Sequence, residues 1–254
     1  MFKRFLTRLL LIAGLASISI TADAESTLVA VAANFTKPMN EIAAEFEKAT
    51  GHSVKLSFGA SGKFVSQIEN GAPFEIFLSA DEKNPLKLEQ AGFAVDGSRF
   101  TYAIGKLALW SNNANTVDDE GRILANGSFQ HLAVADPKLA PYGVAALEVL
   151  KAKGLLEKLQ PLIVQGENIA QTYEFVSTGN AELGFVALSQ IFENGKITQG
   201  SAWLVPDNLY TPILQDAILL KTGTENPAAS ALIAFLKTPA ALAVIEKYGY
   251  DLPK

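Results

Sequence analysis

The chain of 254 residues contains no cysteine. This absence excludes thiol catalysis, metal sites built from cysteine, and stabilisation by disulfide bonds. The fold must therefore be stabilised by a packed core, and a hydrophobic content of 49% is sufficient to form one.

Histidine and catalytic motifs are also scarce. His52 and His131 lie far from each other and from any acidic residue at metal-ligand spacing. Asp81 and Asp136 follow predicted strands, where a catalytic carboxylate could lie, but both stand in ordinary turn sequences. No nucleophile elbow, phosphate-binding loop or dinucleotide fingerprint is present. We therefore predict a protein that is not an enzyme, with no cofactor and no metal held directly by side chains.

Positive charge is not in excess. The 21 Lys and Arg residues are outnumbered by 26 Asp and Glu residues, which gives a net charge of −5. Nucleic acid and anionic membrane surfaces are therefore not expected partners. An acidic chain also does not attract anions over long distances, so any anion site must work through short-range hydrogen bonds.

The most apolar stretch stands near the start, at Leu9–Ile20. It is shorter than the roughly 20 apolar residues of a membrane-spanning helix. Basic residues come before it, and the small-x-small sequence Ala22–Ala24 follows it. This pattern predicts a signal peptide over residues 1–24, cleavage after Ala24, and a periplasmic protein.

Short apolar runs and amphipathic segments alternate along the rest of the chain. Thr27–Ala33 has the composition of a strand buried on both faces, and Pro38–Lys48 has apolar residues at helical spacing. The other predicted strands are 54–58, 76–79, 102–110, 132–135, 162–164, 183–186 and 213–220, and the other predicted helices are 63–70, a helix ending at residue 90, 141–153, 168–177, 228–237 and 239–248. Alternating strands and helices predict an α/β fold with largely parallel sheets.

The order of these elements predicts two lobes. The strand over 102–110 leaves the first region, and the strand over 213–220 returns to it. We predict that lobe 1 comprises residues 25–107 and 216–254, and that lobe 2 comprises residues 108–215. No low-complexity linker separates them, which argues against a flexible tether.

Four junctions between a predicted strand and the following helix are candidates for a binding site. They are Ala33-Asn34-Phe35, Ala60-Ser61-Gly62, Pro141-Tyr142-Gly143 and Glu167-Asn168-Ile169. Ligands of open parallel sheets bind beyond the carboxyl ends of the strands, where helix N-termini present unpaired N–H groups and a positive dipole end. An anion can bind there without a cationic side chain. Small residues such as Ala60 and Gly62 allow close approach to the backbone, and neutral side-chain donors stand beside them.

Each junction also has an interpretation without a ligand. Asn and Ser are common N-cap residues. Tyr142 could be a buried aromatic residue bonded to a backbone carbonyl, and the Ile169 side chain could serve packing only. Lys63 could contact an anion or simply be solvated. The presence of all the junctions in one chain favours the anion site.

Five segments of the chain resemble the periplasmic molybdate-binding proteins of ATP-binding-cassette importers. They occur in the order of that family, from one end of the expected mature chain to the other. They are VAVAANFTKPMNEIAAEFEKATG, SFGASGKFVSQIENGAPFEIFLSADEKNP, VADPKLAPYGVAALEVLKAKG, ENIAQTYEFVSTGNAELGFVALSQI and FLKTPAALAVIEKYGY.

This resemblance implies the two-lobed fold of type II periplasmic binding proteins, each lobe with a central, mostly parallel sheet flanked by helices and with the ligand cleft between the lobes. It implies capture of molybdate or tungstate by neutral donors, and delivery to the permease of an importer in the inner membrane. A monomer suits such a carrier. Carried onto this chain, the implied ligands are Asn34 and Ser61 from lobe 1 and Tyr142 and the backbone N–H of Ile169 from lobe 2, with Phe35, Ala60, Gly62 and Ala187 as secondary candidates.

The chain departs from the family pattern at two positions. Many relatives have serine at the place of Asn34, and some have a binding tyrosine at the place of Ala187. The hydroxyl of Tyr142 could fill the position that Ala187 leaves empty. We expect closure of the lobes by a bend near Leu107 and Ala217. The alternatives are a binding protein of the same fold for another anion, such as sulfate, and an exported α/β enzyme that uses Asp81 or Asp136.

Overall fold

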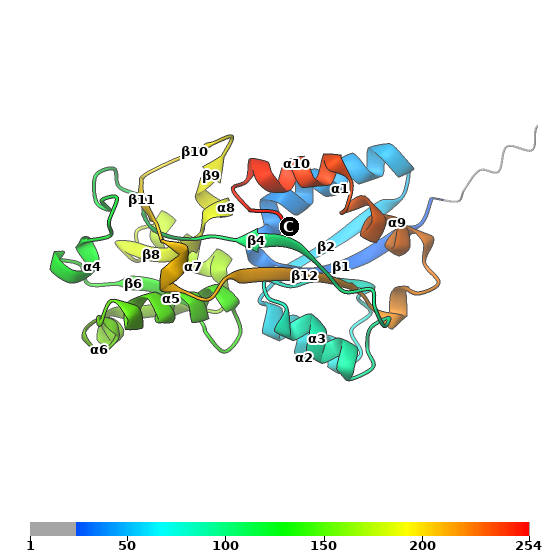
Figure 1. Cartoon of the computed structure of the whole chain (residues 1–254), viewed down its shortest axis with the longest axis horizontal. Coiled ribbons are helices and arrows are strands. Elements are labelled where there is room, and N and C mark those ends of the chain that lie inside the picture. The colour runs from blue at the N-terminus through cyan, green and yellow to red at the C-terminus, as the bar shows by residue number, and fades with distance from the viewer. Residues whose placement is uncertain (1–23, 254) are drawn as a thin grey trace, which may run out of the picture.

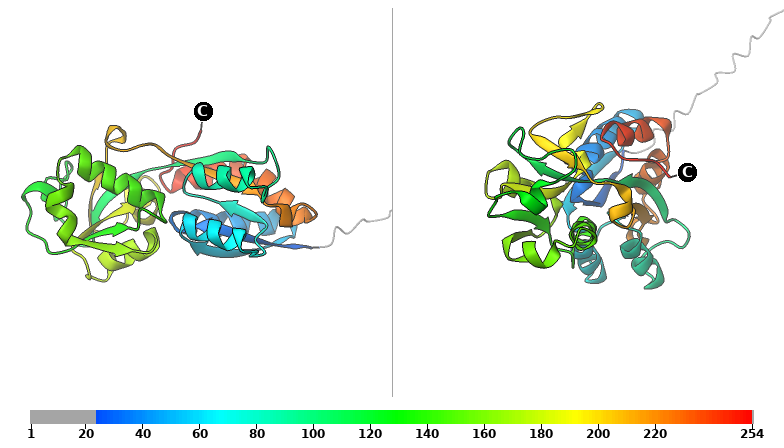
Figure 2. Two further views of the ribbon diagram at one scale, coloured as in Figure 1. Left: turned by 90° about the horizontal axis from the view of Figure 1, so that it is seen from below. Right: turned by 60° about the vertical axis from the view of Figure 1, so that its left-hand side comes forward.

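A computed structural model describes residues 24–253, and the predicted signal peptide lies outside these residues except for Ala24. Two α/β lobes lie side by side along the long axis of the molecule (Figure 1). Each lobe is built on a sheet of five strands. The view from below separates the lobes clearly, with the chain passing between them in extended segments (Figure 2). The predicted two-lobed α/β fold is confirmed.

The sheet of lobe 1 has the strand order β2-β1-β3-β12-β4. Its strands are β1 (Ser26–Ala32), β2 (Ser53–Gly59), β3 (Ile76–Leu78), β4 (Phe100–Gly105) and β12 (Ile213–Leu219). Strand β1 is parallel to β2 and β3, and β12 is antiparallel to β3 and β4. The sheet is therefore mostly parallel, with β12 alone running against the other strands.

The sheet of lobe 2 repeats this plan with the order β11-β5-β8-β6-β7. Its strands are β5 (Leu107–Ser111), β6 (Leu132–Ala135), β7 (Ile163–Gly166), β8 (Leu183–Ala187) and β11 (Ser201–Leu204). Strand β6 is parallel to β7 and β8, while β5 is antiparallel to β8 and β11. Here β5 is the strand that runs against the others.

Helices cover both faces of each sheet, which explains why the central strands are apolar on both sides. In lobe 1 they are α1 (Thr36–Thr50), α2 (Ser61–Glu69), α3 (Lys83–Gln90), α9 (Pro227–Phe235) and α10 (Pro239–Lys247), and in lobe 2 they are α4 (Ile123–Asn126), α5 (Pro141–Ala152), α6 (Leu156–Leu159), α7 (Ile169–Ser177) and α8 (Leu188–Ile191). Helices α1, α9 and α10 lie on one face of the first sheet, and α2 and α3 lie on the other (Figure 1).

The short elements that complete the described chain are the 3-10 helices η1 (Ala33–Phe35), η2 (Gln160–Leu162), η3 (Asp207–Leu209) and η4 (Lys221–Gly223) and the hairpin of β9 (Phe192–Glu193) and β10 (Lys196–Ile197). Among residues 24–253, no single helix has the length and apolarity of a membrane span. Helices α9 and α10 meet that test only as a pair, which is bent by 62°. Both contribute buried residues to the core of lobe 1.

Helix α1 shows how the sequence pattern produces an element. Its buried residues include Met39, Ile42 and Phe46, which share one face of the helix. The helix ends at Gly51, whose φ of 77° is left-handed and whose N–H donates to Glu47 O. The predicted stop at Thr50-Gly51 is confirmed.

The single strand predicted over 102–110 is wrong, because Lys106 divides it into β4 of lobe 1 and β5 of lobe 2. This division marks one connection between the lobes, and the other lies just before β12. The expected bend near Leu107 agrees with the first connection. Ala217 does not mark the second, because it pairs with both Leu78 and Phe100 inside the sheet of lobe 1.

The boundaries predicted for the two lobes, at 107/108 and 215/216, stay predictions. Ile213 pairs with Gly105 in the first sheet, yet its side chain packs in the hydrophobic cluster of lobe 2. The residues near this point belong to both lobes.

Candidate ligand-binding site between the lobes

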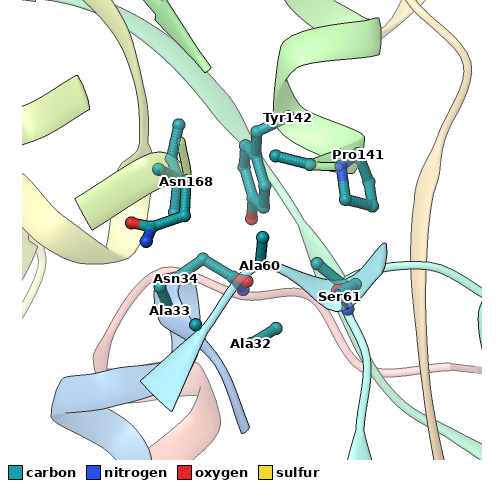
Figure 3. Close-up of a pocket in the computed structure, with 12 residues that line it drawn as sticks. Ala32, Ala33, Asn34, Ala60, Ser61, Pro141, Tyr142 and Asn168 are labelled. Carbon is teal, nitrogen blue, oxygen red and sulfur yellow. Dashed lines mark hydrogen bonds between the residues drawn. The ribbon is translucent and has the colours of Figure 1, made fainter. Parts of the chain in front are cut away.

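A small cavity lies between the lobes, at the carboxyl ends of strands from both sheets (Figure 3). Strand register explains why its walls meet. Ala32 pairs with Gly59 at the ends of β1 and β2, and Ala135 pairs with Gly166 at the ends of β6 and β7. The loops and helices that follow each pair therefore begin next to each other. The cavity is lined by Ala32, Ala33, Asn34, Gly59, Ala60, Ser61, Ala80, Ala140, Pro141, Tyr142, Asn168 and Ile169.

The cavity is narrow and carries no charged side chain among these described lining residues. The space open to the centre of a water-sized sphere is about 10 Å³. By this measure a single water needs ~10–15 Å³. The cavity therefore has the size of about one water and has no room for a sugar or a peptide.

All of the predicted primary site residues line this cavity: Asn34, Ser61, Tyr142 and Ile169. Each belongs to the first turn of η1, α2, α5 or α7. The first N–H groups of a helix have no partner inside that helix, so the backbone of each turn presents donors and a positive dipole end to the cavity. Their role as ligands stays a prediction.

The alternative that these polar residues serve only as N-caps fails at three of the junctions. The residues in the cap position of η1, α2 and α5 are Ala32, Ala60 and Ala140, and none makes a side-chain cap hydrogen bond. At the fourth junction, Glu167-Asn168-Ile169, the polar residue does serve as an N-cap. There the Asn168 side chain accepts hydrogen bonds from Ala170 N at 2.9 Å and Gln171 N at 3.1 Å.

Two hydroxyl groups lie at the cavity as neutral donors. The Ser61 hydroxyl accepts a hydrogen bond from Ala80 N at 3.0 Å, and the Tyr142 hydroxyl accepts one from Gln215 Nε2 at 3.1 Å. A hydroxyl that already accepts from the protein can still donate its own hydrogen. Burial raises the pKa of Tyr142 well above its usual value of 10.0, so this hydroxyl stays protonated at neutral pH.

The side-chain amide of Asn34, which was predicted to bind the ligand, donates its hydrogen bonds to other residues of the protein. Its Nδ2 donates to Gln215 Oε1 and to the Tyr250 hydroxyl, both at 2.9 Å. Both amide hydrogens are therefore already bonded to the protein. The donors that Asn34 can still offer to an anion are therefore backbone N–H groups of its turn.

The secondary candidates differ in position. Ala60 lines the cavity, whereas Phe35, Gly62 and Ala187 are not among its lining residues. Phe35 is a core residue that packs edge-on against Tyr102 and Tyr250. The N–H of Gly62 donates to Leu139 O at 3.0 Å, and that of Ala187 donates to Gln190 Oε1 at 2.9 Å.

The acidic candidates for catalysis do not line the cavity. Asp81 accepts hydrogen bonds from the Ser79 hydroxyl and from Asn84. Burial raises its pKa above the usual value of 3.8. Asp136 accepts a bond from Lys138 N in its own turn. Within residues 24–253, no three His, Cys, Asp or Glu side chains gather as a metal site would require.

Sequence patterns missed the polar residues behind the cavity: Tyr102, Ser189, Gln190, Gln215 and Tyr250. The Tyr250 hydroxyl donates to Asn34 O at 2.9 Å, and the Ser189 hydroxyl donates to the same oxygen at 2.8 Å. Gln190 Nε2 donates to Ile169 O at 3.0 Å. Polar residues within apolar runs, such as Gln215 in ILQDAIL, were the available signal.

The lobes contact each other around the cavity. Besides the bond from Gly62 to Leu139 O, the Lys37 ammonium donates to Gln190 O at 2.8 Å. The bonds from Ser189 to Asn34 O and from Gln215 to Tyr142 also join α8 and α5 to lobe 1. The lobes are therefore in direct contact around the cavity, which is a closed arrangement.

A two-lobed α/β fold that encloses a small uncharged cavity between its lobes defines a solute-binding protein. Residues 27–251 match the family described as bacterial extracellular solute-binding protein. The chain belongs to this family, whose members bind solutes and are not enzymes.

The most informative relatives are molybdate-binding proteins. The molybdate-binding protein ModA of Azotobacter vinelandii is 56% identical over 247 residues, which cover 97% of this chain and 98% of that protein. ModA of Rhodobacter capsulatus is 54% identical over 244 residues, covering 96% and 94%. The solved periplasmic molybdate-binding protein of Azotobacter vinelandii superimposes with a TM-score of 0.87 at 45% identity and covers 90% of this chain and 100% of that structure. These relatives confirm the resemblance expected from the sequence.

Proposed function

We propose that this protein captures molybdate, and also tungstate, in the cavity between its lobes and delivers it to an ATP-binding-cassette importer. The single observation that carries the proposal is the convergence of four helical first turns on an uncharged cavity, in a chain more than half identical to molybdate-binding proteins. Asn34, Ser61, Tyr142 and Ile169 are the proposed ligand-binding residues.

Neutral donors suit a small dianion for a physical reason. A buried lysine or arginine at the site would first have to lose its hydration, at a cost of several kcal/mol that can cancel its attraction for the anion. Backbone N–H groups and hydroxyls instead surround it with many directed hydrogen bonds, and helix dipoles add a positive potential. The phenol of Tyr142 contributes as a donor that stays neutral, because burial raises its pKa well above 10.0.

Selectivity among oxyanions follows from hydrogen bonding and size. Molybdate, tungstate and sulfate are all dianions at neutral pH, so their charge does not separate them. A cavity with donors placed for the longer metal–oxygen bonds leaves sulfate under-coordinated, and each buried donor left unsatisfied costs about 1–3 kcal/mol. Protonated phosphate needs an acceptor for its hydrogen, and the described lining contains no carboxylate. Tungstate has nearly the size of molybdate and should bind as well.

Capture proceeds by closure of the lobes. The anion docks on the open first turns of one lobe, and the other lobe swings over it by bending at Lys106 and at the segment before β12. The contacts between Gly62 and Leu139 and between Ser189 and Asn34 form in the closed state. The permease of the importer recognises this closed form. We further propose that the mature protein is a periplasmic monomer, released after cleavage behind Ala24.

Isothermal titration of the mature protein with molybdate, tungstate, sulfate and phosphate, at one ionic strength, tests the function. We expect tight one-to-one binding of the first two anions and no detectable heat from the others. Equal binding of sulfate would show a less selective oxyanion carrier. No heat from any oxyanion would overturn the proposal, since the fold would then serve another solute.

A further inference from the structure

Gln215 is a fully buried polar residue of β12, close to the connection between the lobes, with an exposed fraction of 0%. Its Oε1 accepts hydrogen bonds from Asn34 Nδ2 at 2.9 Å and from the Tyr102 hydroxyl at 3.0 Å. Both partners are also buried. The Tyr102 hydroxyl lies equally close to Ser79 O, at 3.0 Å. With Oε1 accepting from Asn34, the other end of the Gln215 amide, Nε2, points away as a donor.

That donor meets the proposed ligand-binding residue of the other lobe. Gln215 Nε2 donates to the Tyr142 hydroxyl at 3.1 Å. A phenol that accepts from the protein on one side is left with its own hydrogen for another partner. The side chain of Tyr142 points from α5 toward the cavity, with its oxygen near Asn34 and Ala60 (Figure 3). The phenolic hydrogen can be donated to an anion there or to the neighbouring Tyr250 hydroxyl, and a bound dianion is the stronger acceptor of the two.

The backbone around Gln215 is shaped for this contact. The pairing of β12 with β4 shifts between Gln215 and Asp216, which leaves Tyr102 as an extra residue between Ala103 and Thr101. Bulges of this kind redirect side chains beside functional sites. Gly105 then packs against the hydrogen bond, since a Cβ at this glycine would come closer than 3.0 Å to both the Tyr142 hydroxyl and Gln215 Nε2.

We propose that Gln215 is a positioning residue for oxyanion binding: its fixed amide forces the Tyr142 hydroxyl to donate into the cavity. Gln215 itself does not line the cavity and acts through Tyr142. This inference rests on the proposed function. Gln215 would determine that the Tyr142 hydroxyl donates its hydrogen to the bound solute. A fully deprotonated oxyanion would then be preferred over a solute that itself needs an acceptor.

The substitution Gln215→Glu reverses this direction while preserving the shape of the side chain. One carboxylate oxygen still accepts from Asn34 and Tyr102, but the other now accepts the hydrogen of Tyr142 instead of donating to it. We expect oxyanion affinity to fall roughly 10- to 100-fold at neutral pH. Burial raises the pKa of the introduced carboxyl, so its protonation should restore a donor and recover affinity as pH falls from about 8.5 to about 5.5.

The groups that face position 215 do not titrate over this range. They are the hydroxyls of Tyr102 and Tyr142, and burial raises the pKa of each well above 10.0. The Tyr250 hydroxyl, which contacts both Asn34 and Tyr142, has its pKa raised to about 12, chiefly by burial. The nearest carboxylates are bound elsewhere, Asp216 to Arg99 and Thr101 and Asp81 to Ser79 and Asn84. The wild-type protein, titrated at the same pH values, controls for their contribution.

The experiment is calorimetric titration with molybdate across this pH range for the wild type, Gln215→Glu, Gln215→Met, Tyr142→Phe and the combination of Gln215→Glu with Tyr142→Phe. In the Tyr142→Phe background we expect Gln215→Glu to weaken binding clearly less than in the wild type, because no hydroxyl remains to be reversed. Gln215→Met should weaken binding without the recovery at low pH. A thermal unfolding scan of each variant identifies those that are folded.

Wild-type affinity in Gln215→Glu and Gln215→Met would overturn the inference. An equal loss from Gln215→Glu with and without Tyr142→Phe would also overturn it, since the introduced charge would then act on the anion directly. If the wild type itself fails to bind molybdate, the proposed function is wrong, and this result is distinct from both others.

Discussion

Lys63 and Glu167 form an ion pair that joins the two lobes beside the cavity. Lys63 lies in the first turn of α2 and Glu167 lies just before α7, so each is two positions from a proposed ligand-binding residue. Their side chains are 52% and 47% exposed. Lys63 is therefore paired with an acidic residue in the closed arrangement and does not line the cavity.

Neutralising this pair should weaken molybdate binding only slightly. Exposed ion pairs contribute ~0–1 kcal/mol, so Lys63→Met or Glu167→Gln should cost less than about fivefold in affinity. The loss should shrink as salt is added. Calorimetric titration at low and high ionic strength measures both effects.

The variant Lys87→Met provides a matched control, because Lys87 pairs with Glu69 inside lobe 1 at 2.7 Å. It should leave affinity unchanged at either salt concentration. A loss for Lys63→Met above about tenfold that persists at high salt would instead mean that Lys63 binds the anion directly.

Gly62 joins the backbones of the two lobes next to Ser61, which lines the cavity. Its N–H donates to Leu139 O at 3.0 Å, and a Cβ at this position would lie 3.3 Å from Leu139 Cα. Gly62→Ala should therefore hinder closure while leaving lobe 1 itself intact. We expect affinity to fall by about 1–2 kcal/mol, or roughly 5- to 30-fold, with little change in the melting temperature of the unliganded protein.

Ser66→Ala is the control for Gly62→Ala, since Ser66 lies on the same helix and its hydroxyl bonds only to Gly62 O within that helix among the described contacts. Its affinity should match that of the wild type. An unchanged affinity in Gly62→Ala would show that the lobes close with more space at this contact than the structure has.

Helices α1 and α10 are joined by Glu41, which accepts hydrogen bonds from the Lys247 ammonium at 2.9 Å and the Tyr248 hydroxyl at 2.8 Å. The bond from Lys247 is the main cause that lowers the pKa of Glu41 below its usual value of 4.5. A carboxyl with a lowered folded pKa stabilises the fold above its unfolded pKa, and this stabilisation is lost as pH falls through the folded pKa.

Glu41→Gln should therefore lower the free energy of unfolding at pH 7 relative to the wild type, and the difference should vanish as pH falls well below 4.5. Urea unfolding of both proteins at neutral and acidic pH measures it. A difference that is the same at both pH values would assign the effect to lost packing rather than to charge.

The alternation of apolar strands and amphipathic helices predicted the elements around the cavity closely, because their signals are local. The strand ending near Ala33, the helix opening at Pro141 and the strand 132–135 all lie where the pattern placed them. The short strand β11 and the break at Lys106 were not predictable in this way. Both depend on which sheet a segment joins. Hydrophobic periodicity indicates a strand but does not indicate the sheet to which that strand belongs.

In the candidate site too, local sequence signals predicted some features, while features that depend on long-range contacts could not be predicted. The helix first turns could be predicted because each follows a buried strand, and open α/β sheets bind ligands at such ends. The hydrogen bond from Gln215 to Tyr142 could not, because the partners are 73 positions apart and depend on a bulge opposite β12. For Asn34, the residue type indicated a donor correctly, but only the fold determines that its amide donates to Gln215 and Tyr250.

Tyr142→Phe tests the proposal that this hydroxyl supplies the donor that relatives with a tyrosine at the position of Ala187 would provide. Removing it leaves one oxygen of the buried anion without a partner, at a cost of about 1–3 kcal/mol in binding, or roughly 5- to 150-fold. Calorimetric titration with molybdate measures the loss. Tyr248→Phe is the control, because it removes a hydroxyl bonded to Glu41, away from the cavity, and should keep wild-type affinity.

The position of Ala187 is too tightly packed to contribute a side chain to anion binding. Its side chain is fully buried, and its N–H donates to Gln190 Oε1 at 2.9 Å. Adding a hydroxyl there with Ala187→Tyr should therefore not restore affinity to Tyr142→Phe, since the larger ring has no space in the packed core. If Tyr142→Phe binds molybdate within about twofold of the wild type, the hydroxyl is not a ligand and the compensation hypothesis fails.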